Sequence, residues 1–253
     1  MLWKLLVMVL TFFSRPFEGP VPSYDGSALG PQTWEDTVVA MKALHTKDGD
    51  MRFSPNFQKA GIKDATFHWP GKRVPYYIDP SVQNLTQLIE EAIAQYHKHT
   101  VLRFVKRTDE QNYVCFLKDK GCYSFVGRVG GVQNISLGDG CGYVGTIVHQ
   151  LGHTIGLFHE HQRTDRDKYL NIYKYNISTG QQYNFRKTAS YNELIFTPYD
   201  YNSIMHYGEY AFSKLPGKLK TMEAKDGTPL KEPFCKCGLT SNDIKTINEL
   251  YKH

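Results

Sequence analysis

Three histidines fall within one short segment, residues 149–159 (HQLGHTIGLFH), and their spacing constrains the fold of the chain around them. His149 and His153 are four positions apart, which places both side chains on one face of an α-helix. Gly156 tolerates a positive φ, so the chain can turn out of the helix there and bring His159 back. Three neutral imidazoles at this spacing suit one zinc ion and leave a fourth position for water. We therefore expect a helix that stops at Gly156 and carries a zinc site.

The composition is that of an ordinary globular protein. The chain has 253 residues, of which 41% are hydrophobic and 22% are charged, and this is enough apolar material for a buried core. Low hydrophobicity with high net charge, the mark of a disordered chain, is absent. The net charge is only +5, and the basic residues form no run. We therefore expect no nucleic-acid partner.

The hydrophobic pattern predicts a mixture of strands and helices. Strand-like runs occupy residues 74–78, 102–105 and 113–117. Between the first two runs, apolar residues recur at helical spacing and predict a helix with one apolar face: Leu85, Leu88, Ile89, Ala92, Ile93 and Tyr96. A last helix is expected to begin at Thr240, which stands at capping-box spacing from Asp243. Because the elements do not alternate regularly, the pattern indicates an α+β fold.

The first residues have the pattern of a secretory signal peptide. A short basic start is followed by nine apolar residues at 5–13, too few to span a bilayer, which takes ~20. We assign residues 1–23 to this signal, with the position of its cut left open, and we expect a secreted protein. No later run is apolar enough to be a membrane anchor. Three sequons then become candidate glycosylation sites: Asn84, Asn134 and Asn176.

Five cysteines are compatible with an oxidising compartment. Cys122 and Cys141 bracket an alternating, glycine-rich stretch, as a disulfide that links parts of a sheet would, and we expect them to pair. Cysteines two positions apart seldom bond each other without strain. We therefore expect Cys115 to pair with either Cys235 or Cys237, which leaves one free thiol.

The histidine segment resembles the zinc motif of the astacin family of metzincin metalloendopeptidases. The family pattern is H-E-x-x-H-x-x-G-x-x-H-E, and this chain is similar to it at His149, His153, Gly156, His159 and Glu160. The resemblance extends over roughly Trp69 to Tyr251, and we assign residues 60–253 to an astacin-like metallopeptidase domain. It implies a metzincin fold of two subdomains with an active-site cleft between them, and one zinc ion per chain on the floor of the cleft.

A second motif strengthens the resemblance. Residues 203–207 (SIMHY) look like the family's Met-turn. The resemblance then implies that Met205 lies beneath the zinc site and that Tyr207 is an additional zinc ligand, which can swing to the oxyanion during catalysis. It implies hydrolysis of peptide bonds by zinc-activated water, with a peptide or protein as substrate. We expect the chain to act as a monomer.

Gln150 departs from the family pattern at the position of the catalytic glutamate. In the family that glutamate accepts a proton from the attacking water and delivers it to the leaving amine. A glutamine amide accepts no proton at neutral pH, and loss of such a group costs on the order of 10²–10⁴ in rate. Zinc binding should remain, because this residue is not a ligand. Two interpretations stay open: a strongly impaired endopeptidase, or an inactive pseudoprotease that binds peptides or a protein partner in the cleft.

Residues 24–59 are interpreted as a prosegment, so the chain's own prosegment is one expected partner. By resemblance, Asp50 is the zymogen latch that occupies the position of the zinc-bound water. The family's spacing places the mature N-terminus at Ala60, and Lys59 before it offers a site for a trypsin-like enzyme. The resemblance further implies that Glu160 holds the new amino terminus through water.

Overall fold

The computed structural model describes residues 30–31, 33–46, 49–55, 63–189 and 193–252. The expected signal peptide and the processing site between Lys59 and Ala60 lie outside these residues and stay predictions. Most of the expected prosegment after residue 29 is described, as is almost the whole expected protease domain.

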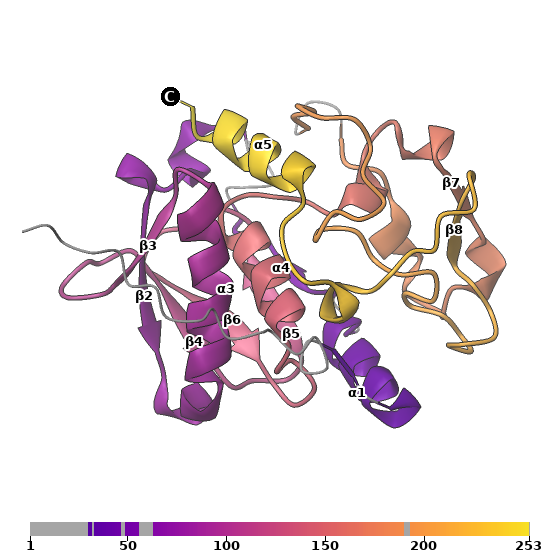
Figure 1. The fold of residues 1–253 in the computed structure, drawn as a ribbon, viewed down its shortest axis with the longest axis horizontal. Coiled ribbons are helices and arrows are strands. Elements are labelled where there is room, and N and C mark those ends of the chain that lie inside the picture. The colour runs from indigo at the N-terminus through magenta and orange to yellow at the C-terminus, as the bar shows by residue number, and fades with distance from the viewer. Residues whose placement is uncertain (1–29, 32, 47–48, 56–62, 190–192, 253) are drawn as a thin grey trace, which may run out of the picture.

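A six-stranded mixed sheet forms one half of the molecule (Figure 1). Its strand order is β1-β5-β6-β4-β2-β3, in which β5 pairs antiparallel with β6 and the other neighbours pair in parallel. The strands are β1 (Met51–Arg52), β2 (Arg73–Ile78), β3 (Arg103–Lys106), β4 (Tyr113–Leu117), β5 (Cys122–Phe125) and β6 (Val132–Leu137). The three strands expected from the sequence are β2, β3 and β4.

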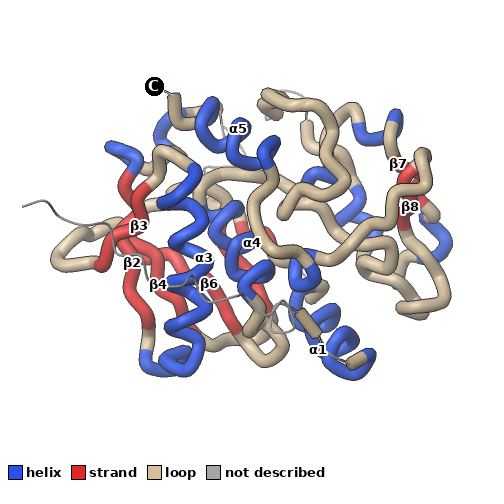
Figure 2. Tube along the Cα trace, in the orientation of Figure 1, coloured by secondary structure: helices blue, strands red, loops and turns tan. Residues whose placement is uncertain are grey.

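Two helices, α3 (Thr86–His99) and α4 (Val144–Thr154), lie side by side against the sheet (Figure 2). Four of the six residues of the predicted apolar stripe, Ile89, Ala92, Ile93 and Tyr96, are buried in α3, whereas Leu85 and Leu88 are half-buried. The Tyr96 hydroxyl donates a hydrogen bond of 2.7 Å to the Val148 carbonyl of α4. This bond ties the histidine-bearing helix to its neighbour. Among the described residues, no helix is long and apolar enough to cross a bilayer.

The other half of the molecule follows α4 and has little regular structure (Figure 2). Its two-stranded sheet consists of β7 (Leu170–Ile172) and β8 (Met222–Ala224), and the chain continues into α5 (Ser241–Leu250). The described 3-10 helices of both halves are Ala65–Phe67, Pro70–Lys72, Pro80–Leu85, Glu160–Gln162, Arg166–Lys168, Lys174–Asn176, Gln182–Phe185 and Pro233–Cys235. The mixed, non-alternating order confirms the predicted α+β class.

A helix that the sequence pattern did not predict, α1 (Trp34–Leu44), lies in the expected prosegment. Its capping box pairs Thr33 with Asp36, and its buried residues are Ala40, Met41, Ala43 and Leu44. After α1 the chain continues to β1, which adds to the sheet beside β5. The expected prosegment is therefore packed against the rest of the protein at both a helix and a strand.

One of the two disulfide predictions is confirmed and the other is wrong. Cys122 and Cys141 form a disulfide, as expected. The second predicted bridge is wrong, because Cys115, Cys235 and Cys237 are all free. Side chains alternate between the faces of β4, so the half-buried Cys115 points away from the helix layer, where Val114 and Phe116 are fully buried. Cys235 ends the 3-10 helix that packs on α4, so the sheet and the helices separate it from Cys115.

The three sequons differ in how open they are. Asn84 is exposed, whereas Asn134 lies on β6 and is only partly exposed. The side-chain nitrogen of Asn176 donates a hydrogen bond of 2.6 Å to the Lys220 carbonyl. Because a glycan attaches to that nitrogen, Asn84 is the most open of the three candidates.

Asp243 links α5 to the segment of the expected Met-turn. Its substitution therefore measures how much this link contributes to stability. Its carboxylate accepts hydrogen bonds from Ser203 Oγ (2.6 Å), Ile204 N (2.9 Å) and Thr240 N (2.9 Å). Asp243→Ala should lower the free energy of unfolding by roughly 3 kcal/mol, because three buried donors lose a charged acceptor. Urea unfolding measures this effect.

The matched control is Asp226→Ala, which removes an exposed carboxylate that accepts one bond, from Thr228 N. We expect a change below ~1 kcal/mol for this variant. Equal losses in the two variants would contradict a special role for Asp243.

Candidate active site

The three histidines of the motif meet at one point. His149 and His153 come from α4, and His159 from the chain just after it. The Nε2 atom of His153 lies 3.1 Å from that of His149 and 3.2 Å from that of His159. Two nitrogens bound to one tetrahedral zinc at ~2.0–2.1 Å are ~3.3 Å apart, so this spacing fits a shared ion.

Main-chain carbonyls orient two of these rings. The Nδ1 atom of His149 lies 2.7 Å from the Ile204 carbonyl oxygen, and that of His153 lies 2.8 Å from the Leu157 carbonyl oxygen. A carbonyl only accepts, so each Nδ1 carries the proton and each Nε2 presents a lone pair. Lone pairs directed at one another 3.1 Å apart repel, and a cation between them removes that repulsion.

Asp50, which lies just before β1, completes the cluster. Its Oδ2 atom lies 2.9 Å from His149 Nε2, and its Oδ1 atom lies 3.1 Å from His159 Nε2. The ligand atoms of the four side chains all lie within 4.8 Å of one another, and all four side chains are buried. Three imidazoles and one carboxylate therefore form a donor set suited to a single zinc ion.

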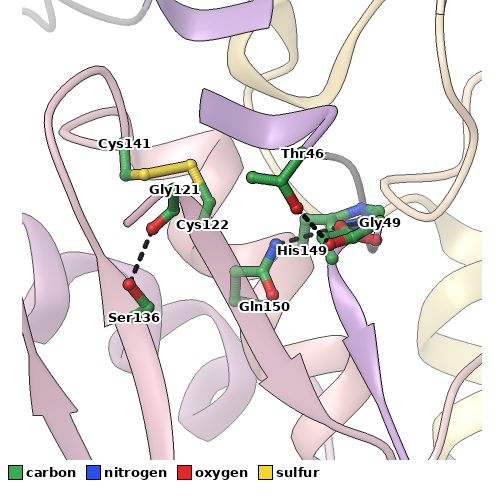
Figure 3. The surroundings of a disulfide bond; sticks show 9 residues. Thr46, Gly49, Gly121, Cys122, Ser136, Cys141, His149 and Gln150 are labelled. Atoms are coloured by element: carbon green, nitrogen blue, oxygen red, sulfur yellow. Dashed lines mark hydrogen bonds and ion pairs between the residues drawn. A yellow bond between two sulfur atoms is a disulfide. The ribbon is translucent and has the colours of Figure 1, made fainter. Parts of the chain in front are cut away.

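The loop that carries Asp50 is held by local hydrogen bonds. The Gly49 carbonyl accepts from the Thr46 hydroxyl at 2.6 Å and from Arg52 at 3.1 Å, and Figure 3 shows the first of these beside His149 and Gln150. The Asp50 carbonyl in turn accepts from Ser124 N of β5 at 2.9 Å. The carboxylate is thus placed by the prosegment's attachment to the sheet.

Burial sets the protonation of the cluster. Burial lowers the pKa of His149, and that of His159 to about 4, which favours the neutral rings that bind metal. Burial alone would raise the pKa of Asp50, but the positive charge of protonated neighbouring histidines, His159 first, holds it well below its usual value. A zinc ion bound by neutral rings would supply positive charge at the same place. Asp50 therefore remains a carboxylate.

Two glycines shape the metal-binding segment. Gly156 has a φ of +108°, which confirms the expected turn out of the helix. Gly152 stands between the first two histidines, and a Cβ there would lie 2.5 Å from the Met205 sulfur. Sequence reasoning missed Gly152. Its absent side chain is what lets the methionine pack directly against α4.

Residues 203–207, which have the pattern of a Met-turn, lie against the cluster of three histidines and Asp50. Met205 is 2% exposed, and its carbonyl accepts a hydrogen bond of 3.0 Å from Glu160 N, next to His159. The ring of Tyr207 lies 4.3 Å from the ring of His159. Burial, and then the charge of Asp50, raises the pKa of Tyr207, and its hydroxyl has no hydrogen-bond partner among the described residues. The hydroxyl is thus buried and protonated beside the cluster.

Gln150 faces the cluster rather than solvent. It is fully buried, and its Nε2 donates a hydrogen bond of 3.0 Å to Asp50 Oδ2. The Gln150 side-chain oxygen has no partner among the described residues. The position at which the resemblance places the family's glutamate is therefore occupied by an amide that donates a hydrogen bond to the Asp50 carboxylate.

Glu160 lies beside a small cavity behind the metal cluster. The cavity has a volume of about 80 Å³, and its lining includes Asp200 and Asp243. Glu160 accepts hydrogen bonds from Arg163 (2.9 Å) and from Asp200 N (3.0 Å), and burial raises its pKa to about 7. Acidic groups thus form one part of the lining, beside apolar side chains and the Arg163 guanidinium.

Comparison with known proteins identifies the family. The model of the Astacin family, a family of peptidases, matches residues 61–252. The chain belongs to the astacin family. The three histidines and Asp50 are accordingly a zinc site, since the family's members are zinc metalloproteases and the donor set fits one ion.

Relatives agree with this family assignment. Astacin-like metalloprotease toxin 1 of the spider Loxosceles intermedia is 43% identical over 224 residues, which cover 86% of this chain and 84% of the relative. The astacin-like metalloendopeptidase of Gallus gallus is 36% identical over 243 residues, or 90% of this chain and 58% of the relative. This chain thus spans little more than half of the chicken protein.

A solved structure supports the astacin fold. The structure of high choriolytic enzyme 1, a hatching-enzyme zinc protease of the medaka fish Oryzias latipes, superposes with a TM-score of 0.69. The two chains are 35% identical, and the match covers 75% of this chain and 96% of that one. The α+β architecture described above is therefore that of an astacin-family enzyme.

Zinc content provides a direct test of the site. Purified protein should hold one zinc per chain, and His153→Ala should lose most of it because the central ligand is gone. His161→Gln is the matched control, since the His161 ring stacks on His159 but its Nε2 faces the Asn184 carbonyl at 3.0 Å. Elemental analysis measures both variants. Zinc retained by the His153 variant, or lost by the His161 variant, would contradict the ligand set.

Proposed function

We propose that the chain is a secreted astacin-family zinc endopeptidase whose turnover is strongly reduced by Gln150. A zinc ion bound at this site would lower the pKa of a bound water to ~7 and polarise a peptide carbonyl. His149, His153 and His159 hold the ion. Tyr207, with its protonated hydroxyl beside His159, is proposed as the further ligand that moves to stabilise the oxyanion.

The contact between Gln150 and Asp50 carries this proposal. Among the described residues, Asp50 is the only carboxylate grouped with the three histidines, and it belongs to the prosegment. Once the prosegment leaves, the remaining side chain at the acid–base position is the Gln150 amide. That amide can orient a water by hydrogen bonding but accepts no proton from it, so peptide hydrolysis loses its general base.

The same contact favours a second candidate, a pseudoprotease that binds peptides or a protein partner without cutting them. An amide donates a hydrogen bond to an incoming carboxylate, where an ionised glutamate would repel it. The buried Gln150 Nε2 makes such a bond to Asp50 at 3.0 Å. Binding of anionic groups is thus supported at the position where catalysis is weakened.

The remaining parts of the proposal concern processing and location. We propose that residues 1–23 are a signal peptide, that 24–59 form a prosegment latched by Asp50, and that cleavage after Lys59 frees Ala60. The acidic part of the cavity beside Glu160 supports this processing, because a new amino terminus is cationic and suits acidic groups. The disulfide between Cys122 and Cys141 supports export, and Asn84 is then the most open glycosylation candidate.

Restoring the glutamate tests the enzyme against the pseudoprotease. After cleavage at Lys59, Gln150→Glu should cut casein on the order of 10²–10⁴ faster than the unaltered chain, because the general base returns. Gln111→Glu, at an exposed position, is the control for the added charge and should change nothing. A measurable rate in the unaltered chain supports the impaired enzyme, and no rate above background supports the pseudoprotease. A revertant that stays inactive with zinc bound would overturn both accounts of Gln150.

The prosegment latch is tested by peptide binding. Residues 24–59, added as a free peptide, should bind the processed Gln150 form ~10-fold or more tightly than its Gln150→Glu variant, because the glutamate would repel Asp50. The same peptide with Asp50→Ala should bind the Gln150 form much more weakly. Isothermal titration measures both affinities. Equal or tighter binding by the glutamate variant would remove the argument.

A further inference from the structure

A buried acid–base contact joins the prosegment to the protein at a second place, beside the zinc site. His45 follows helix α1, and its Nε2 lies 3.3 Å from Glu232 Oε2. Both side chains are more than nine-tenths buried. The His45 ring also contacts the rings of Tyr207, with centroids 4.8 Å apart, and Phe212, at 4.6 Å. The prosegment therefore inserts an imidazole next to the proposed zinc-binding tyrosine.

The Glu232 carboxylate is poorly satisfied by this occupant. Neither of its oxygens, nor His45 Nε2, has a hydrogen bond with good geometry among the described residues. Lys236 interacts with Glu232 through its charge, but its ammonium donates hydrogen bonds to the carbonyls of Ser203 and His206. A buried carboxylate without hydrogen bonds is costly, and most buried polar groups in proteins avoid this state. A ligand with better-placed donors would satisfy both oxygens.

The surroundings of Glu232 suit a flat cation. Tyr207 and Phe212 present aromatic rings, on which a guanidinium stacks favourably. A cavity of about 190 Å³ adjoins His45 on its other side, between helix α1 and the segment of Tyr210 and Phe212. It gives room for a side chain longer than histidine. A guanidinium could also donate two parallel hydrogen bonds to the carboxylate, which an imidazole cannot.

We propose that Glu232, with the rings of Tyr207 and Phe212, is a cation subsite that takes an arginine or lysine side chain of a bound peptide. His45 of the prosegment occupies this subsite in the structure described here. The assignment of a peptide as ligand rests on the proposed function, whereas the affinity of the subsite for a cation does not. The subsite would thus make the protein selective for basic peptides. His45 of the prosegment would occupy the position of a basic side chain of such a peptide.

Chemical rescue in the zinc-loaded full chain tests the subsite. His45→Ala removes the occupant, and methylguanidinium is the probe, with the neutral N-methylurea as its matched control. Methylguanidinium should raise the melting midpoint of His45→Ala by about 2–4 °C relative to N-methylurea. The double variant His45→Ala/Glu232→Gln should show no such difference. Equal effects of the probe on the two variants, or no effect on either, would overturn the subsite.

A second pair of variants covers the case in which His45→Ala does not fold. His45→Lys keeps a cation beside Glu232, and His45→Met places a neutral chain of similar length there. The lysine variant should melt higher than the methionine variant, and Glu232→Gln should abolish that difference. A difference that persists in the Glu232→Gln background would overturn the subsite.

Peptide selectivity is measured on the full chain after cleavage at Lys59. Two fluorescent hexapeptides that differ only by arginine or glutamine at one position serve as probes, each compared with Glu232→Gln protein. We expect the arginine peptide to bind ~10-fold more tightly, and only when Glu232 is present. Methylguanidinium rescue without binding of either peptide would retain the subsite and overturn the proposed peptide-binding function. Equal binding of both peptides would overturn the selectivity.

Discussion

The hydrogen bonds from two histidine rings to main-chain carbonyls are the constraint on which the rest of the site depends. His149 is held by the Ile204 carbonyl and His153 by the Leu157 carbonyl. Each bond places the proton on Nδ1 and so turns Nε2 into a metal ligand. The first bond also joins α4 to the segment before Met205. The same hydrogen bonds therefore set the orientation of the rings and their protonation state, and the bond of His149 also connects the two halves of the molecule.

The charge beside the three histidines then determines how the Asp50 carboxylate is held. The cluster presents neutral imidazoles, a buried tyrosine and the Gln150 amide to the ion, so Asp50 is the one carboxylate grouped with them among the described residues. A glutamate at position 150 would add a second negative charge beside Asp50. The amide instead donates a hydrogen bond to it. We propose that this one change of residue type weakens proton transfer and strengthens the hold on an anion, because both effects follow from the loss of a single carboxylate.

Periodicity and spacing predicted the elements that have strong local signals. The stripe of α3, the capping box of α5 and the turn at Gly156 all depend on residues close in sequence, and all were found. Helix α1 was missed although Thr33 and Asp36 stand at capping-box spacing, because its apolar face is short and is completed only by packing. The pairing of Cys115 failed because β4 turns this side chain away from the helix layer.

The sequence by itself predicted the family and a zinc site at the three histidines, because these predictions depend on residue types at fixed local spacings. Only the tertiary structure decided which distant groups meet them. The carbonyls that orient the rings, the packing of Met205 against Gly152 and the contact of His45 with Glu232 join residues far apart in the chain. Main-chain carbonyls leave no mark in a sequence, and a buried carboxylate looks there like an exposed one. Their roles appear only when folding brings them together in a space without water.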